Sequence, residues 1–269
     1  MNGQRLFAEL LVRPELRAEL RADPGAFARA HGLDPALCGR IAGLPEPGME
    51  LTTGITQYER RLRVTTVFPA TFALADSAQR EALLRSALTH PRLSRGGDAA
   101  AVEVGRLLAK AAAEWAPEAG GGVSLLAEMV EFETLCEEAL ASARALPGRV
   151  PGPPAPAPGV LFVTSGRPLP VIRRLLLGGT PPAELAAAVA AESADEGPWH
   201  YALRAEARPP RTRCHRLPAR LARLLTYCDG TRGLPELATL TELPEPTAER
   251  TLRTMVGRGL ITWRAAGPE

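Results

Sequence analysis

The sequence contains few aromatic residues and carries little net charge. Phe, Trp and Tyr together make up 4% of its 269 residues, and the formal net charge at pH 7 is +2. So few aromatic side chains argue against a surface on which nucleic-acid bases stack. A net charge this small does not by itself indicate a nucleic-acid partner.

Motifs that carry catalysis or hold metals are also missing. The four histidines are His31, His90, His200 and His215. No two of them are three or four residues apart, none lies in an HExxH motif, and the four cysteines form no CxxC pair. Cys214, His215 and Cys228 could supply three metal ligands, but neighbouring residues of a strand point to opposite faces. We therefore predict a chain with no catalytic residue, no metal site and no cofactor of its own.

Long apolar runs are absent as well. No window approaches the length of about 18 uncharged apolar residues that a membrane-spanning helix needs. The N-terminal stretch is interrupted by Arg5, Glu9 and Arg13, so it lacks the apolar core of a signal peptide. These patterns predict a cytoplasmic protein.

A proline-rich stretch divides the chain. Residues 147–159 read PGRVPGPPAPAPG, a composition typical of a semi-rigid, extended linker. A chain of this length accommodates about two domains. We predict an all-helical domain over residues 1–146 and a smaller module of strands and helices over residues 160–269, which makes the protein α+β.

Helix signals recur in the N-terminal part. Asp23-Pro24 and Asp34-Pro35 each place a capping side chain before a proline that suits the first helical turn. Residues 43–53 contain several glycines and prolines and are predicted to form a loop.

The next helix is predicted from residue 54 onward. Ile55, Tyr58 and Leu62 share one face of it. Three arginines lie off that face: Arg60, Arg61 and Arg63. They form either a solvated surface or a docking surface, because arginine is favoured at interfaces.

The last third of the chain has the most regular pattern. Three short amphipathic helices follow one another between residues 218 and 256, and a strand over residues 260–263 follows the third helix, Thr247 to Val256. Upstream, residues 199–204 and 212–217 alternate as strands do. The order predicts a winged-helix module with a three-stranded antiparallel sheet.

Two segments of this module, LLTYCDGTRGLPELA and AERTLRTMVGRGLI, resemble the pyrroloquinoline-quinone peptide chaperone and the wider class of recognition elements for ribosomally made precursor peptides. The segment QYERRLRVTTVFPATFALAD is similar to the arginine-rich helix of the accessory subunits that partner multinuclear non-haem iron-dependent oxidative enzymes. The order of parts over roughly residues 50–264 is similar too.

The resemblance implies a non-catalytic subunit that forms a heterodimer with an iron-containing TIM-barrel enzyme, which would modify a precursor peptide at cysteine. The iron would belong to that enzyme. The leader peptide would lie as an added strand against the edge of the sheet. Its implied binding residues are Thr212, Arg213, Cys214, His215, Leu217, Thr247, Arg250, Thr251, Arg253 and Thr254. The implied enzyme interface is Tyr58, Arg60, Arg61 and Arg63.

A second interpretation is a DNA-binding regulator, in which Arg250 and Arg253 of the third helix would enter the major groove. Glu245 and Glu249 lie beside these arginines and would repel phosphate. This arrangement favours a peptide over nucleic acid as the partner. An enzyme in its own right is the interpretation with the least support.

Overall fold

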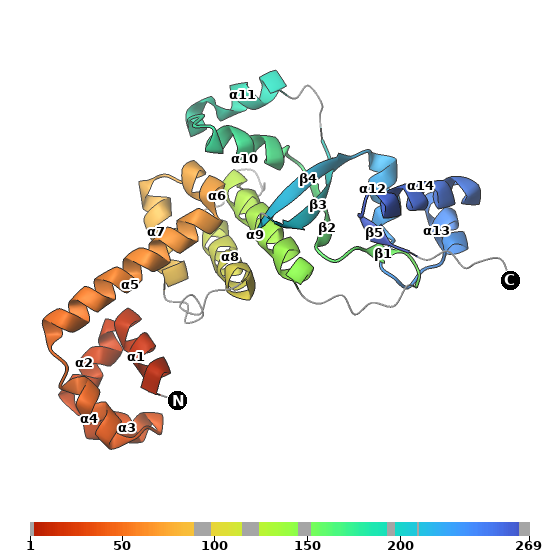
Figure 1. The fold of residues 1–269 in the computed structure, drawn as a ribbon. Helices are drawn as coiled ribbons and strands as arrows, with labels where there is room; N and C mark the ends of the chain where they lie inside the picture. The colour runs from red at the N-terminus through yellow and green to blue at the C-terminus, as the bar shows by residue number, and fades with distance from the viewer. Residues whose placement is uncertain are drawn as a thin grey trace. The chain divides into compact units, whose positions relative to one another are not determined.

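The computed structural model describes residues 3–88, 98–114, 124–144, 152–192, 197–208 and 210–263. Contacts divide the chain into two compact units, Met1–Ala127 and Glu128–Glu269. The first unit is helical, and the second combines helices with a small antiparallel sheet, which confirms the predicted α+β class (Figure 1). Most of helix α9, Leu125–Arg144, belongs to the second unit.

The described part of the first unit is built from helices. They are α1 (Gly3–Val12), α2 (Pro14–Ala22), α3 (Pro24–His31), α4 (Pro35–Ala42), α5 (Glu46–Val67), α6 (Pro69–Leu74), α7 (Ser77–Leu88) and α8 (Asp98–Ala113).

The predicted caps of α3 and α4 are confirmed. The Asp23 carboxylate accepts a hydrogen bond from the Ala26 N–H at 2.8 Å, and the Asp34 carboxylate accepts one from the Ala36 N–H at 3.0 Å. Helices α1 to α4 enclose a core of their own, whose buried members are Leu6, Leu10, Leu16, Leu20, Phe27, Ala28, Cys38 and Ile41.

Helix α5 differs from the sequence-based prediction in two ways. It begins at Glu46, within the predicted loop, because a proline at the start of a helix costs no hydrogen bond and Pro47 occupies such a position. Its buried side consists of Met49, Arg60 and Val64, whereas the apolar face around Tyr58 is exposed.

The second unit contains the rest of the regular structure. Its further elements are β1 (Ala155–Pro156), β2 (Val160–Ser165), α10 (Leu169–Leu177), the 3₁₀ turn η2 (Pro182–Glu184), α11 (Leu185–Glu192), β3 (Trp199–Ala207), β4 (Pro210–Leu217), α12 (Ala219–Thr226), α13 (Leu234–Thr241), α14 (Glu245–Gly257) and β5 (Ile261–Thr262).

The sheet has the antiparallel order β2-β3-β4, in which Val160 pairs with Arg204 and Ala202 pairs with His215. This confirms the two strands predicted around residues 199–217. The short strand β5 pairs not with this sheet but with β1, which lies inside the predicted linker stretch. Residues 145–151 of that region lie outside the described residues.

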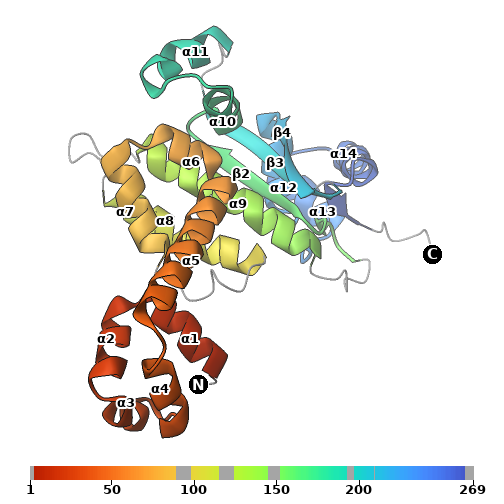
Figure 2. The same ribbon diagram turned by 60° about the vertical axis from the view of Figure 1, so that its left-hand side comes forward.

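The sheet of the second unit lies between two layers of helices, α9 on one face and α12 to α14 on the other (Figures 1 and 2). On the α9 face, the Thr212 hydroxyl donates to the Cys136 carbonyl at 2.9 Å. On the other face, Ala202 and Leu217 join a buried cluster with Leu225 and Leu252. The alternation of side chains along each strand thus supplies both cores.

Candidate functional site

Helices α13 and α14 are joined by a tight turn of three residues, Glu242 to Pro244. Glu242 adopts the left-handed conformation with φ 57°, and the Leu243 N–H donates to the Ala238 carbonyl at 3.0 Å. This is the hydrogen bond of a Schellman motif, which ends one helix and redirects the chain. Two helices joined by such a turn form a helix-turn-helix unit.

Helix α14 has an apolar inner face and a polar outer face. Ala248, Leu252 and Met255 are buried at helical spacing and fix the helix onto the module. Val256 lies one residue off this row and is 37% exposed.

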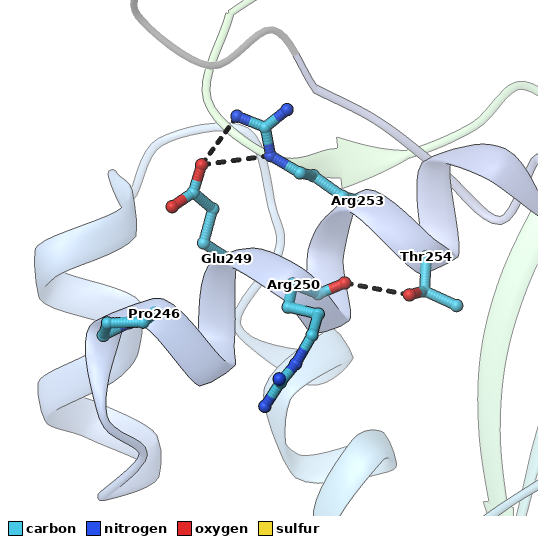
Figure 3. A pocket seen from close by; sticks show the side chains of 5 residues that line it. All are labelled: Pro246, Glu249, Arg250, Arg253 and Thr254. Atoms are coloured by element: carbon cyan, nitrogen blue, oxygen red, sulfur yellow. Dashed lines mark hydrogen bonds and ion pairs between the residues drawn. The ribbon is translucent and has the colours of Figure 1, made fainter.

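The outer face of α14 borders a shallow hollow of about 480 Å³ (Figure 3). Five residues line it: Pro246, Glu249, Arg250, Arg253 and Thr254. The Thr254 hydroxyl donates to the Arg250 carbonyl at 2.9 Å, so its hydrogen atom is committed to the helix itself.

The two arginines of this face have different environments. The Arg253 guanidinium donates to the Glu249 carboxylate at 3.0 and 2.7 Å. Figure 3 shows the Arg250 side chain pointing away from that pair, and within the described ranges its guanidinium has no hydrogen-bond or ion-pair partner. Arg250 is therefore an exposed cation available to a ligand.

Other arginines of this module also fall into two groups, those that lie near a carboxylate and those that do not. Arg232 is held by the Asp229 carboxylate at 2.5 Å, and Arg223 lies 3.5 Å from the Glu242 carboxylate. Arg220 and Arg258 are exposed, and in the part of the chain that the structure covers their guanidinium groups have no such partner. Among the described residues 219–263, the arginines without a carboxylate partner thus lie on α12, on α14 and in the turn after α14.

The residues predicted on β4, an edge strand of the sheet, alternate between its two faces. Thr212 faces α9, as its hydrogen bond to Cys136 shows, and Cys214, two residues further along the strand, lies on the same side. Arg213 instead lies 2.5 Å from the Glu206 carboxylate, exposed on the other side with His215. Leu217 is buried in the core of the module.

Some of the residues predicted on α14 are exposed, and others form hydrogen bonds within their own helix. The Thr251 hydroxyl donates to the Thr247 carbonyl at 2.8 Å, which again satisfies a threonine within its own helix. Arg250, Arg253 and Thr254 do lie together, at the hollow. Sequence reasoning missed Pro246 there, and it treated Glu249 only as a repelling charge, although its spacing of four residues from Arg253 indicates a pair.

The cysteines of the second unit are poor metal ligands. Burial raises the pKa of the Cys214 thiol to about 12, and burial together with the charge of Asp229 raises the pKa of the Cys228 thiol to about 12. A thiol must lose its proton to bind a metal, so these values disfavour binding at neutral pH. Among the described residues, no group of three His, Cys, Asp or Glu side chains could hold a metal ion.

The four residues predicted on α5 point in two directions. Arg60 is buried, its guanidinium donates to the Leu88 carbonyl at 2.6 Å, and burial lowers the pKa of this side chain. It is therefore not available to a partner. Tyr58, Arg61 and Arg63 are exposed, and the Arg61 guanidinium lies 3.6 Å from the Glu81 carboxylate.

None of the helices that the structure describes combines the length and apolar character needed to cross a lipid bilayer.

Comparison with known families identifies part of the second unit. Residues 219–265, which run from α12 past β5, match a family model described as the IclR helix-turn-helix domain. Comparison with curated proteins found no match.

This match corrects the family resemblance drawn from the sequence. The assignment as an accessory subunit of an iron-dependent peptide-modifying enzyme is wrong, and so are the predicted enzyme and precursor-peptide partners and the preference for a peptide over nucleic acid. Three helices closed by a strand are common to both kinds of module, so the order of elements could not separate them. The charge argument failed because Glu249 pairs with Arg253, and Arg250 has no partner among the described residues. What the chain contains over residues 219–265 is thus a segment similar to an IclR helix-turn-helix domain.

Proposed function

We propose that this protein binds duplex DNA through α12 to α14 and regulates transcription, with α14 as the recognition helix. The observation that carries the proposal is the outer face of α14, where Arg250, exposed and without a partner among the described residues, lies on the second helix of a helix-turn-helix unit. In such units the second helix lies in the major groove, and its N-terminal residues contact base edges.

The shape of α14 suits the major groove. Its 13 residues extend for about 20 Å, and the groove is about 12 Å wide and admits one α-helix. Its buried row, Ala248, Leu252 and Met255, is attached to the module, so the opposite row is free to enter the groove.

The side chains of the outer face supply several kinds of base contact. Arg250 can donate two hydrogen bonds to O6 and N7 of guanine, the commonest specific contact in the major groove. Glu249 can accept from N4 of cytosine, and the methyl group of Thr254 can pack against that of thymine. The Glu249–Arg253 pair is exposed, so separating it to contact bases costs less than about 1 kcal/mol.

Phosphate contacts are expected to be few. The matched segment carries seven arginines against five carboxylates, and several of these arginines are paired. Arg220 and Arg258 are the exposed, unpaired candidates for phosphate within the described part of the segment. Since each neutralised phosphate contributes about −0.9 to the slope of log K against log salt, we expect a shallow salt dependence.

We further propose that the protein acts without catalysis and without a cofactor of its own, and that it is located in the cytoplasm with the DNA. The α14 face is suited to binding rather than to catalysis, because its side chains form a charged, hydrogen-bonding surface and not an enclosed pocket.

The test is selection of bound sequences from a random duplex library by the full chain, followed by affinity measurement on the selected site. Arg250→Ala is expected to weaken specific binding by about 1–3 kcal/mol and to relax the preference at one base pair. The matched control is Arg80→Ala, which removes the same charge from an exposed site on α7. No enriched sequence, or equal affinity of the Arg250→Ala and Arg80→Ala variants, would contradict the proposal.

A further inference from the structure

Four large apolar side chains are exposed along one helix of the first unit. Leu51, Ile55, Tyr58 and Leu62 of α5 are 67%, 51%, 68% and 53% exposed. Single exposed apolar residues are normal on protein surfaces, but a row of them on one helix marks an interaction site.

The spacing of this row, which we call the α5 stripe, is four, three and four residues. Its mean of about 3.5–3.7 residues is that of the narrow seam along which two helices pack in a coiled coil. The seam does not face the core of its own unit, because the buried side of α5 is formed by Met49, Arg60 and Val64. Helix α5 therefore has a second apolar face beyond the one that its own unit buries.

We propose that the α5 stripe packs against the α5 stripe of a second copy of this chain, with the two helices antiparallel and related by a two-fold axis. An isologous contact of this kind brings the same patch of both copies together. With the axis between Ile55 and Tyr58, Leu51 of one copy lies opposite Leu62 of the other.

The charges beside the stripe favour the antiparallel direction. The N-terminal end of the stripe carries Glu50 and the C-terminal end carries Arg61, both exposed and on the same flank of the stripe. In the register given above, Glu50 of one copy lies near Arg61 of the other, at both ends of the pair. A parallel pair would place like charges together, and it would also align the two helix dipoles unfavourably.

Self-association through the α5 stripe does not depend on DNA binding. Only one consequence rests on the proposed function: two copies would carry two helix-turn-helix modules, and their operator would be a pair of inverted half-sites.

The experiment is sedimentation equilibrium of the full chain without DNA. Wild-type protein is expected to have twice the mass of the chain at micromolar concentration, and Leu62→Glu is expected to raise the dissociation constant of the dimer at least roughly 100-fold. The matched control is Leu177→Glu on α10, where the leucine is 47% exposed and lies outside the stripe. Circular dichroism checks that both variants remain helical.

Charge exchange tests the direction of pairing. Glu50→Arg and Arg61→Glu are each expected to weaken the dimer severalfold, and the double variant is expected to restore it, because the two positions lie 11 residues apart and can meet only between copies. Three results would overturn the proposal: a monomer at about 100 µM, a dimer unaffected by Leu62→Glu, or a double variant weaker than both single ones. Arg250→Ala should leave the dimer intact, so loss of DNA binding and loss of self-association are distinguishable.

Discussion

Helices α5 and α14 each present an exposed face, but the two faces have opposite chemistry. The face of α14 is polar and includes an exposed cation, Arg250, whereas the face of α5 is a row of large apolar side chains. Water solvates the face of α14 well, so this face is stable without a ligand, and its exposed arginine can bind a polyanion. Water solvates the second face poorly, so burial against a partner stabilises it. Exposure alone therefore does not identify a kind of partner; the side chains that are exposed do.

The largest expected effect contrasts a buried leucine of α14 with an exposed one of α5. Leu252 is fully buried, and Leu252→Ala should lower the free energy of unfolding of the second unit by about 2–5 kcal/mol because it leaves a cavity. Leu62→Ala should change the stability of the monomer by about 0.5 kcal/mol or less. Urea unfolding measures both losses, at a protein concentration too low for the chain to self-associate. Equal losses would show that the α5 stripe is covered within one chain.

The next effect concerns the charge of the α14 face. Glu249→Gln should raise the affinity for duplexes of unselected sequence severalfold, because it removes a negative charge and releases Arg253 from its ion pair. Fluorescence anisotropy on a duplex without the selected site measures it at two salt concentrations. The control is Glu236→Gln on α13, which removes a carboxylate near Arg232 rather than one on the hollow. Unchanged affinity for Glu249→Gln would mean that the hollow does not face DNA.

Alkaline pH should weaken the core behind α14, which contains Cys228. Burial raises the pKa of Cys228 from an ordinary value of 9.0 to about 12. A raised pKa means that its contribution to stability is complete below pH 9 and is lost between pH 9 and 12, where only the unfolded state releases the proton. Thermal melting of wild type and Cys228→Ala across this range measures the contribution. A steeper loss in the variant would contradict it.

The smallest expected effect lies in the turn that positions α14. Glu242→Gly should stabilise the second unit by about 0.5–1 kcal/mol, because glycine adopts the left-handed conformation without the steric cost of a side chain. Glu242→Ala, which keeps the Cβ atom and removes only the carboxylate, should give no such gain. If both variants gain equally, the carboxylate rather than the backbone is responsible.

Local features of the fold were predictable from short stretches of sequence. The caps at Asp23 and Asp34 depend on residues within three positions of each other, and strands β3 and β4 follow from alternation over a few residues. The order of three helices and a strand was also predictable, but it suits peptide-binding and DNA-binding modules alike. The order alone could therefore not decide the function.

The sequence by itself determined where helices and strands form and which residues repeat along them, because these depend on neighbours in the chain. The tertiary structure decided which repeating face is covered. It buries Arg60 and leaves Leu62 exposed, covers the Thr212 side of β4 with α9, and pairs Arg253 with a carboxylate while Arg250 has no such partner among the described residues. Each of these outcomes depends on groups far away in the sequence, such as the Leu88 carbonyl and α9, or on which rotamers bring two charges together. Only the packed chain places these groups.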